Sequence, residues 1–338
     1  MKKIMMFCAL MVVIFVSVLF VSPKPTIWLL QHSLFSIPKD SRPAQYQEPN
    51  VIVSTNLTYP SKFQRNTFDF YKTKVPLAHQ PVVIWVHGGG FVGGDKLEVK
   101  AYATELASQG YSVFVLNYEL VPTAKYPEPV IQVSEAIRYI KTSFAKQHNL
   151  NMANIFIAGD SAGAQIALQF LLIQSNPQYA DLLNIQKTLN LSDIRGGLLY
   201  CGPYDLKNMV LQANSAITRF AFGRIGWAYL EDKDWLTRTE DKGLVVSEYL
   251  NAALPPIYLT DGNTASFEQQ ARQLERQLQK VGVATKSRYF DQKTDPTAHE
   301  YQFLLDTKPA QLTLKDTLQF MDTYRQKSFD QNHNKHKC

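Results

Sequence analysis

Cysteine is scarce in this chain of 338 residues, which contains only Cys8, Cys201 and Cys338. The first lies in an N-terminal apolar run, the second ends an apolar run in the middle of the chain, and the third is the last residue. Three thiols in these positions do not make a disulfide framework, and their spacing is not that of a metal site. We therefore expect no structural disulfide in the folded domain, no metal and no other cofactor.

Charge is also modest, since charged residues make up 19% of the chain and the net charge is +6. No basic module with interleaved aromatic residues is present, which argues against a nucleic-acid partner. Internal repeats and long low-complexity tracts are absent too. The chain is 45% hydrophobic, which is enough for one large core. The polar residues 329–338 are expected to form a disordered tail.

Charged residues are missing altogether from residues 4–21, which follow Lys2 and Lys3. At about 1.5 Å per residue this apolar run would be about 27 Å long as a helix, close to the roughly 30 Å hydrocarbon thickness of a bilayer. The two lysines favour an orientation with the following chain outside the cytoplasm. We predict that residues 1–22 form a signal-anchor helix in the cell membrane. Cleavage as a signal peptide, followed by secretion, is the alternative, although no Ala-x-Ala site is evident.

The central part of the chain alternates between short apolar runs and helical patterns. The runs lie at 82–86, 112–116, 155–158, 197–200 and 256–259, and the helical patterns lie near 97–109, 128–146, 162–174, 266–281 and 309–326. This alternation predicts an α/β fold, in which a mostly parallel sheet has helices on both faces. We place this domain at 61–328, after residues 23–60, which we expect to be a linker and a cap or lead-in segment. Within that segment, residues 28–37 are apolar but too short to span a bilayer.

The most informative motif is Gly159-Asp160-Ser161-Ala162-Gly163, which joins a predicted strand to a predicted helix. A Gly-x-Ser-x-Gly turn in this context is typical of a nucleophile elbow, which exposes the serine hydroxyl above a sheet. The flanking glycines let the strand and the helix approach closely. Ser161 is therefore the candidate nucleophile.

A second motif, His87-Gly88-Gly89-Gly90, follows the apolar run at 82–86. Consecutive glycines leave backbone N–H groups uncovered, and such donors stabilise the negative charge that develops on a carbonyl oxygen during acyl transfer. We expect Gly89 and Gly90 to form an oxyanion hole. Ala162 is expected to add a third N–H group from the first turn of the helix after Ser161.

Together these two motifs resemble the hormone-sensitive-lipase-like branch of the α/β-hydrolases. Residues 117–122 are similar to the family's Asp-Tyr-Arg-Leu-Ala-Pro segment, although Asn117 and Glu119 stand where relatives have Asp and Arg. Residues 254–260 resemble the strand before the catalytic acid, and residues 299–303 resemble the late histidine loop. The resemblance covers about residues 50 to 326. It also implies that an insertion, here about 203–250, forms a small cap with an N-terminal segment. The aromatic residues of this insertion would either line the substrate pocket or form the cap's own core.

The base is expected to be His299, because the family order along the chain is Ser, acid, His. Among the seven histidines, His299 alone follows the last predicted strand, at 285–290, and precedes the last predicted helix. The acid is less clear, because relatives carry it where this chain has Asn263 or Thr264. We prefer Asp261 and keep Glu268 as the alternative, since Glu268 also suits the first turn of the following helix. A dyad without an acid remains open.

These features predict a serine carboxylic-ester hydrolase that acts on small or short-acyl esters outside the cytoplasm. The short acyl chain is expected from the family resemblance alone. An amidase or formamidase on the same fold is the first alternative, because the elbow and the oxyanion hole suit both bond types. The second is a non-catalytic surface protein that uses the hydrolase fold for binding, which the missing acid at 263–264 would favour. The oligomeric state cannot be predicted from the sequence.

Overall fold

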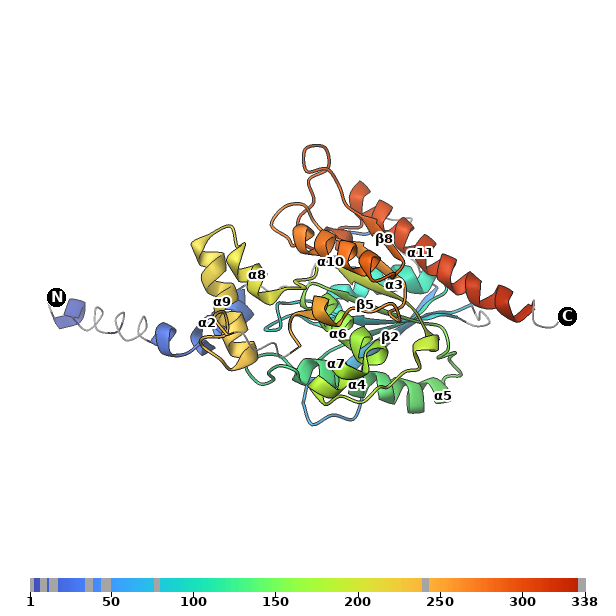
Figure 1. Ribbon diagram of the computed structural model, residues 1–338, viewed down its shortest axis with the longest axis horizontal. Coiled ribbons are helices and arrows are strands. Elements are labelled where there is room, and N and C mark those ends of the chain that lie inside the picture. Colours follow the sequence, from blue (N-terminus) through green and yellow to red (C-terminus); the bar gives the residue numbers. More distant parts are fainter. Residues whose placement is uncertain are drawn as a thin grey trace.

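An eight-stranded sheet forms the centre of the molecule (Figure 1). The structure is a computed structural model that describes residues 3–6, 11, 18–33, 39–43, 50–75, 80–238 and 243–333, with the backbone alone for 326–333. The strands are β1 (Val51–Thr58), β2 (Thr67–Thr73), β3 (Val82–Val86), β4 (Ser112–Leu116), β5 (Ile155–Asp160), β6 (Ile194–Tyr200), β7 (Ile257–Thr260) and β8 (Thr285–Arg288). Their spatial order is β1-β2-β4-β3-β5-β6-β7-β8. Strands β3 to β8 pair in parallel, whereas β1 pairs antiparallel with β2 and β2 antiparallel with β4.

Helices cover both faces of the sheet. They include α2 (Lys24–Ser33), α3 (Lys100–Ser108), α4 (Glu128–Tyr139), α5 (Ala145–Gln147), α6 (Ala162–Ser175), α7 (Pro177–Leu183), α8 (Leu206–Leu211), α9 (Ala216–Leu230), α10 (Glu268–Lys280) and α11 (Lys308–His333). Helices α3 and α11 share one apolar cluster with one face of the strands, and α4, α6 and α10 share the other. Every residue of β3, β4 and β5 is buried, which explains the apolar runs in these strands; the exceptions are Ser112 at the start of β4 and Gly159-Asp160 at the end of β5. The predicted mostly parallel sheet with helices on both faces is confirmed.

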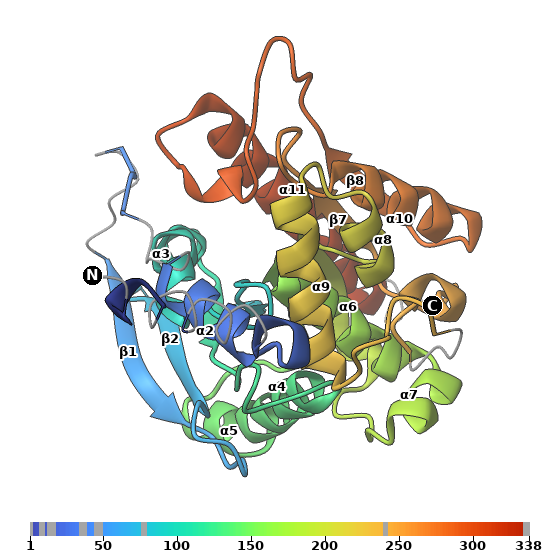
Figure 2. The same ribbon diagram turned by 90° about the vertical axis from the view of Figure 1, so that its left-hand side faces the viewer.

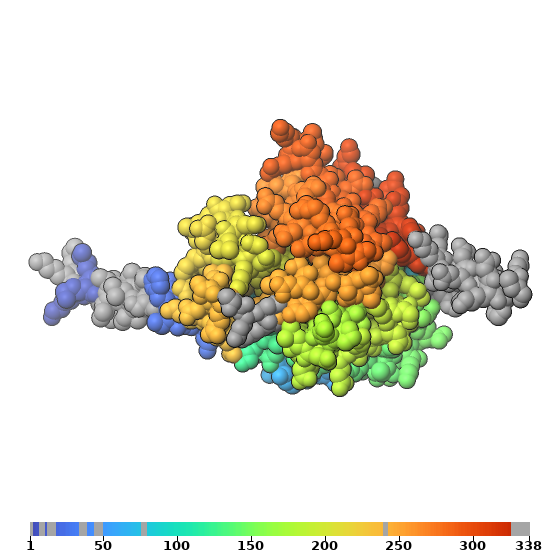
Figure 3. All heavy atoms as spheres, in the orientation of Figure 1, coloured from blue at the N-terminus to red at the C-terminus, as the bar shows by residue number. Residues whose placement is uncertain are grey.

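The segment predicted as a cap, 203–250, contains α8 and α9, which lie between β6 and β7 in the chain. Figure 2 shows α2 beside α9, and Figure 3 shows this region at the end of the molecule from which the N-terminus extends. Gln31 of α2 attaches the helix to the domain, because its Nε2 donates to the carbonyls of Val92 at 2.8 Å and Val121 at 3.0 Å. Within the apolar stretch that begins at Trp28, Leu30 and Gln31 thus contact the hydrolase domain, whereas Trp28 and Leu29 are exposed.

Two boundaries differ from the sequence predictions. Strand β1 lies within residues 23–60, where we expected a linker and lead-in segment, and it pairs with β2 along the edge of the sheet. Helix α11 continues to His333, although a disordered tail was predicted from residue 329. After Pro309 in its first turn, the helix meets no further proline or glycine that would end it before that point.

The predicted membrane anchor falls mainly on residues 7–10 and 12–17, which lie outside the described residues. Among the residues that are described, we find no helix with both the length and the apolar character needed to cross a bilayer. The anchor therefore stays a prediction.

Candidate active site

The predicted site residues gather at the carboxyl ends of the parallel strands. Ser161 follows the last residue of β5, Asp261 follows the last residue of β7, and the glycine loop follows β3. His299 lies in the loop between β8 and α11. Because parallel strands bring their carboxyl ends to one edge of the sheet, residues from four distant segments meet there.

The turn at Ser161 holds a strained backbone. Its φ of 51° and ψ of −123° lie outside the regions that non-glycine residues favour, at a cost of about 1–3 kcal/mol. The surrounding contacts enforce this geometry: a Cβ atom on Gly159 would lie 2.3 Å from the Gly163 carbonyl oxygen, and one on Gly163 would lie 2.0 Å from the Val86 carbonyl oxygen. The Ser161 N–H donates to the Tyr200 carbonyl at 2.8 Å. Glycine is therefore required on both sides of the serine.

The structure places Ser161 and His299 in direct contact, with 2.9 Å between Ser161 Oγ and His299 Nε2. The surrounding protein strips water from the imidazole and lowers the pKa of His299 to about 4. The ring is consequently neutral at pH 7, which is the form that accepts a proton from the serine hydroxyl. The Phe267 ring packs edge-on against the imidazole, with 5.3 Å between ring centroids.

Asp261 reaches His299 through a third residue, Ser266. His299 Nδ1 lies 2.7 Å from Ser266 Oγ, and this hydroxyl donates a short hydrogen bond to Asp261 Oδ1. The Phe267 N–H donates to the same carboxylate oxygen at 3.2 Å. Asp261 is completely buried, and burial raises its pKa to about 7.

The alternative acid, Glu268, is placed differently. It lies in the first turn of α10, and its Oε1 accepts a hydrogen bond from Arg272 Nε at 2.6 Å. The structure thus joins Asp261, and not Glu268, to the histidine through hydrogen bonds.

Asn263 occupies one of the positions where relatives carry the acid, and here it connects two loops. Its Oδ1 accepts from the Thr297 N–H at 2.9 Å, and its Nδ2 donates to the Phe290 carbonyl at 3.2 Å and to the Asp295 carbonyl at 3.0 Å. A parallel backbone bridge joins Thr264 to Ala298. These contacts fix the segment that precedes His299.

The glycine loop lies beside the serine. Gly89 and Gly90 have φ values of 101° and 60°, and a Cβ atom on Gly89 would lie 2.2 Å from the Gly93 carbonyl oxygen. Within the described part of the chain, the N–H groups of Gly89 and Gly90 donate to no backbone carbonyl. Ala162 is the first residue of α6, where N–H groups lack partners within the helix. All three predicted oxyanion donors therefore lie next to Ser161 in space or in sequence.

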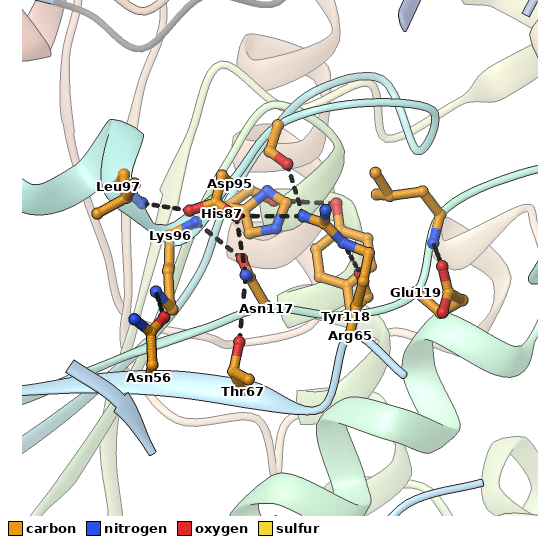
Figure 4. Close-up of polar contacts among 12 residues, drawn as sticks. Asn56, Arg65, Thr67, His87, Asp95, Lys96, Leu97, Asn117, Tyr118 and Glu119 are labelled. Atoms are coloured by element: carbon orange, nitrogen blue, oxygen red, sulfur yellow. Dashed lines mark hydrogen bonds and ion pairs between the residues drawn. The ribbon is translucent and has the colours of Figure 1, made fainter. Parts of the chain in front are cut away.

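A polar network lies beside His87 and the segment that follows the glycine loop (Figure 4). Arg65 donates to the Tyr118 carbonyl at 3.1 Å and to the Gly94 carbonyl at 2.8 Å. Asn117 donates to Asp95 Oδ2 at 2.9 Å and accepts from the Lys96 N–H at 2.8 Å. Asn117 thus holds the segment at Asp95 and Lys96, at a position where relatives have Asp. Arg65, from the segment between β1 and β2, supplies a guanidinium to the same network.

A pair of carboxyl groups lies next to the serine and the histidine. Asp160 is buried and accepts from Trp85 Nε1 at 2.6 Å and from the Gly88 N–H at 2.8 Å. Glu300 hydrogen bonds to Asp160, and burial raises the pKa of Glu300 well above its usual value. Because two N–H donors favour the ionised form of Asp160, we assign the shared proton to Glu300. The neutral Glu300 then lies with its Oε1 3.7 Å from His299 Nε2.

A cavity of about 490 Å³ opens beside Ser161 and His299. Its wall is mainly apolar and comes from the cap, α2 and the loop before α10, including Leu30, Met209, Phe222, Ile225 and Phe267. Of the aromatic residues in the insertion, Phe222 lines this cavity, whereas Trp235 packs within the cap and donates from Nε1 to the Gly223 carbonyl at 3.1 Å. Tyr229 instead stacks on Phe91, directly after the glycine loop, with 4.3 Å between ring centroids. Both uses predicted for these aromatic residues therefore occur.

Three possible metal donors lie close together at the site. The donor atoms of Cys201, Asp261 and His299 are all within 4.8 Å of one another. Asp261 and His299 already hydrogen bond to Ser266, and the Cys201 thiol donates to Gln302 Oε1 at 3.5 Å. The absence of a metal cofactor stays a prediction.

Sequence reasoning did not identify Ser266, Arg65 or Glu300. Ser266 lies five residues after Asp261, and only the path of the loop shows that it faces the imidazole. Glu300 is adjacent to His299, so its position was a usable signal. Arg65 comes from the segment between β1 and β2, and β1 was not predicted.

Comparison with known proteins agrees with this geometry. The BD-FAE family model matches residues 68–278, which is more than half of the chain. An acetyl esterase of Salmonella schwarzengrund is 26% identical over 207 residues, which cover 59% of this chain and 60% of the relative; the match thus spans less than two thirds of that relative's length.

Solved structures show the same fold. Inhibited esterase B from Lactobacillus rhamnosis has a TM-score of 0.73 at 21% identity, covering 85% of this chain and 91% of the esterase. A hyperthermophilic esterase from Pyrobaculum calidifontis has a TM-score of 0.63 at 14% identity, covering 91% and 92%. The resemblance to α/β-hydrolase esterases is confirmed, and the chain belongs to the BD-FAE family.

Proposed function

We propose that this protein is a serine carboxylic-ester hydrolase. The observation that carries the proposal is the contact between Ser161 Oγ and His299 Nε2 in a chain whose family and fold are those of esterases. In the proposed reaction, His299 removes the hydroxyl proton as Ser161 Oγ attacks the ester carbonyl. The N–H groups of Gly89, Gly90 and Ala162 stabilise the oxyanion.

The second half of the reaction regenerates the enzyme. His299 gives its proton to the departing alcohol, which leaves an acyl group on Ser161. Water then attacks this acyl-enzyme with His299 again as base, and the carboxylic acid departs. Asp261 stabilises the transient imidazolium through Ser266. The apolar cavity beneath the cap suits a small or short acyl group, as does the similarity to an acetyl esterase.

A substrate pair tests the reaction type. We expect p-nitrophenyl acetate to be hydrolysed with a kcat/KM at least about 100-fold above that of p-nitroacetanilide, because the phenolate leaves far more easily than the anilide nitrogen. Initial rates at 405 nm measure both reactions. Comparable rates on the two compounds would favour an amidase, and no turnover of either would favour a non-catalytic binding protein.

We also propose that residues 4–21 anchor the protein in the cell membrane with the catalytic domain outside the cytoplasm. The uncharged apolar run after Lys2 and Lys3 supports this arrangement. In cells that express the full chain, the protein should sediment with membranes and be degraded by protease added to intact spheroplasts. Release of a shortened chain into the medium would indicate cleavage and secretion instead, and recovery in the soluble cytoplasmic fraction would contradict both.

A further inference from the structure

We propose that Ser266 is a positioning residue that connects His299 to Asp261, so that the hydrogen-bonded chain behind the nucleophile has four members instead of three. This inference rests on the proposed function, because it assigns a task to a residue that does not touch the substrate. The chain runs from Ser161 to His299 to Ser266 to Asp261. Its three links are 2.9 Å from Ser161 Oγ to His299 Nε2, 2.7 Å from His299 Nδ1 to Ser266 Oγ, and the short hydrogen bond from Ser266 to Asp261.

The position of Asp261 explains why a bridging hydroxyl is needed. Asp261 directly follows the last residue of β7 and is completely buried, whereas relatives carry the acid two or three residues later, where this chain has Asn263 or Thr264. From its deeper position, the Asp261 carboxylate hydrogen bonds to Ser266 and to the Phe267 N–H. Ser266 lies where the loop turns back toward α10, and its hydroxyl contacts both the carboxylate and the imidazole.

The direction of each hydrogen bond follows from which of the three groups carries a proton to donate. Above its pKa of about 7, the Asp261 carboxylate is ionised and only accepts hydrogen bonds, so the single hydroxyl proton of Ser266 then goes to Asp261. The Ser266 oxygen must then accept from His299, which places the imidazole proton on Nδ1. Nε2 is left with a free lone pair facing Ser161, and this is the tautomer that a general base requires. Asp261 thus selects the histidine tautomer through Ser266.

The hydrogen bonds from His299 through Ser266 to Asp261 also stabilise the positive charge that His299 acquires during the reaction. The Nδ1–H group then donates more strongly to Ser266, which in turn donates more strongly to Asp261, because hydrogen bonds in a chain polarise one another. Without the hydroxyl, the Nδ1–H group would lose its hydrogen-bond acceptor in the protein. The loss should appear mainly in kcat, since the imidazolium forms during the reaction and not on substrate binding.

Three variants of the full chain test this assignment on p-nitrophenyl acetate. Ser266→Ala should lower kcat by about 100-fold, within the range of general acid–base effects, and leave KM nearly unchanged. Ser266→Thr keeps a hydroxyl and should recover most of the lost kcat. The control is Thr294→Ala, which removes an exposed hydroxyl that donates to the neighbouring Asp295 carboxylate at 3.0 Å, and it should behave as wild type.

Two further readouts separate positioning from a general structural loss. If Ser266 and Asp261 act through the same hydrogen-bonded chain, their effects should not add. The kcat of the double variant Ser266→Ala/Asp261→Ala should then be no lower than the kcat of the slower single variant. The pH profile of kcat/KM should change shape in Ser266→Ala, whereas a structural defect would lower the rate equally at every pH. A thermal unfolding curve for each variant confirms that it is folded.

Any one of three results overturns the proposal. Ser266→Ala could retain kcat within about twofold of wild type, or a folded Ser266→Thr variant could fail to recover activity. The third is that the losses of kcat in the two single variants add in the double variant. These outcomes are distinct from failure of the proposed function, which would appear as wild-type turnover that does not depend on Ser161.

Discussion

Replacing Ser161 by alanine is expected to lower kcat for p-nitrophenyl acetate by about 10⁴-fold or more. The reason is that the acyl group has no other nucleophile to accept it, so only water attack assisted by the oxyanion donors remains. The hydroxyl that is removed lies 2.9 Å from His299 Nε2 at the strained turn after β5. Initial rates measured on purified wild type and variant give the ratio directly.

The matched control is Ser175→Ala at the other end of α6, where the hydroxyl donates to the Leu172 carbonyl at 3.5 Å and accepts from Asn251 Nδ2 at 3.4 Å. This control should retain wild-type kcat and KM. Alanine at 161 also changes a residue with positive φ, so thermal unfolding of both variants must show a folded protein. A folded Ser161→Ala variant that keeps more than a tenth of wild-type kcat would contradict the assignment of Ser161 as nucleophile.

Replacing Asp261 by asparagine should have the second largest effect, a loss of about 10³-fold in kcat. Asparagine keeps an oxygen for the Ser266 hydroxyl and the Phe267 N–H but removes the negative charge that stabilises the imidazolium. Glu268→Gln is the matched control, because Glu268 pairs with Arg272 in α10 and should leave kcat unchanged. If Glu268→Gln caused the larger loss, the acid would have been assigned to the wrong carboxylate.

The Asp261→Asn variant should also change the pH dependence of stability. Burial raises the pKa of Asp261 from 3.8 to about 7, so between these values the folded state holds a proton that the unfolded state has lost. The contribution of Asp261 to the free energy of unfolding therefore falls as pH rises across this window, by about 1.4 kcal/mol per pH unit and about 4 kcal/mol in total. Asparagine does not ionise, so the stability of the variant should not show this decrease with rising pH.

Urea unfolding at pH 4 and pH 8 measures the effect. The stability of Asp261→Asn relative to wild type should be greater at pH 8 than at pH 4. An equal difference at both pH values would mean that Asp261 ionises normally in the folded protein. A variant that is less active but more stable at pH 8 would show that the buried charge serves catalysis at the expense of stability.

Local sequence patterns were sufficient for much of the fold. The fully buried strands β3 and β4 coincide with the predicted runs, because strands covered on both faces consist of continuous apolar residues. Strand β1 has an exposed edge and a mixed pattern, so nothing local distinguished it from a linker. Its pairing with β2 became visible only in the assembled sheet.

Local sequence patterns also predicted part of the site, namely the residues at the ends of strands and in the late histidine loop. Ser161 and His299 were predicted because each lies at a position that strand order determines, and the structure brings the two side chains into contact. Asp261 was found as the carboxylate at the end of β7, but its link to His299 depends on a hydroxyl in the following loop. No sequence pattern reports the direction of a loop side chain, so the role of Ser266 needed three-dimensional coordinates.

The most direct test of the central claim is covalent labelling of the wild-type chain with a fluorophosphonate, followed by peptide mass spectrometry. Such reagents phosphonylate a serine whose hydroxyl is activated by a neighbouring base. We predict one adduct, on the peptide that contains Ser161, and its loss when His299 is replaced by alanine. No adduct, or an adduct on a different serine, would contradict the account of Ser161 as an activated nucleophile.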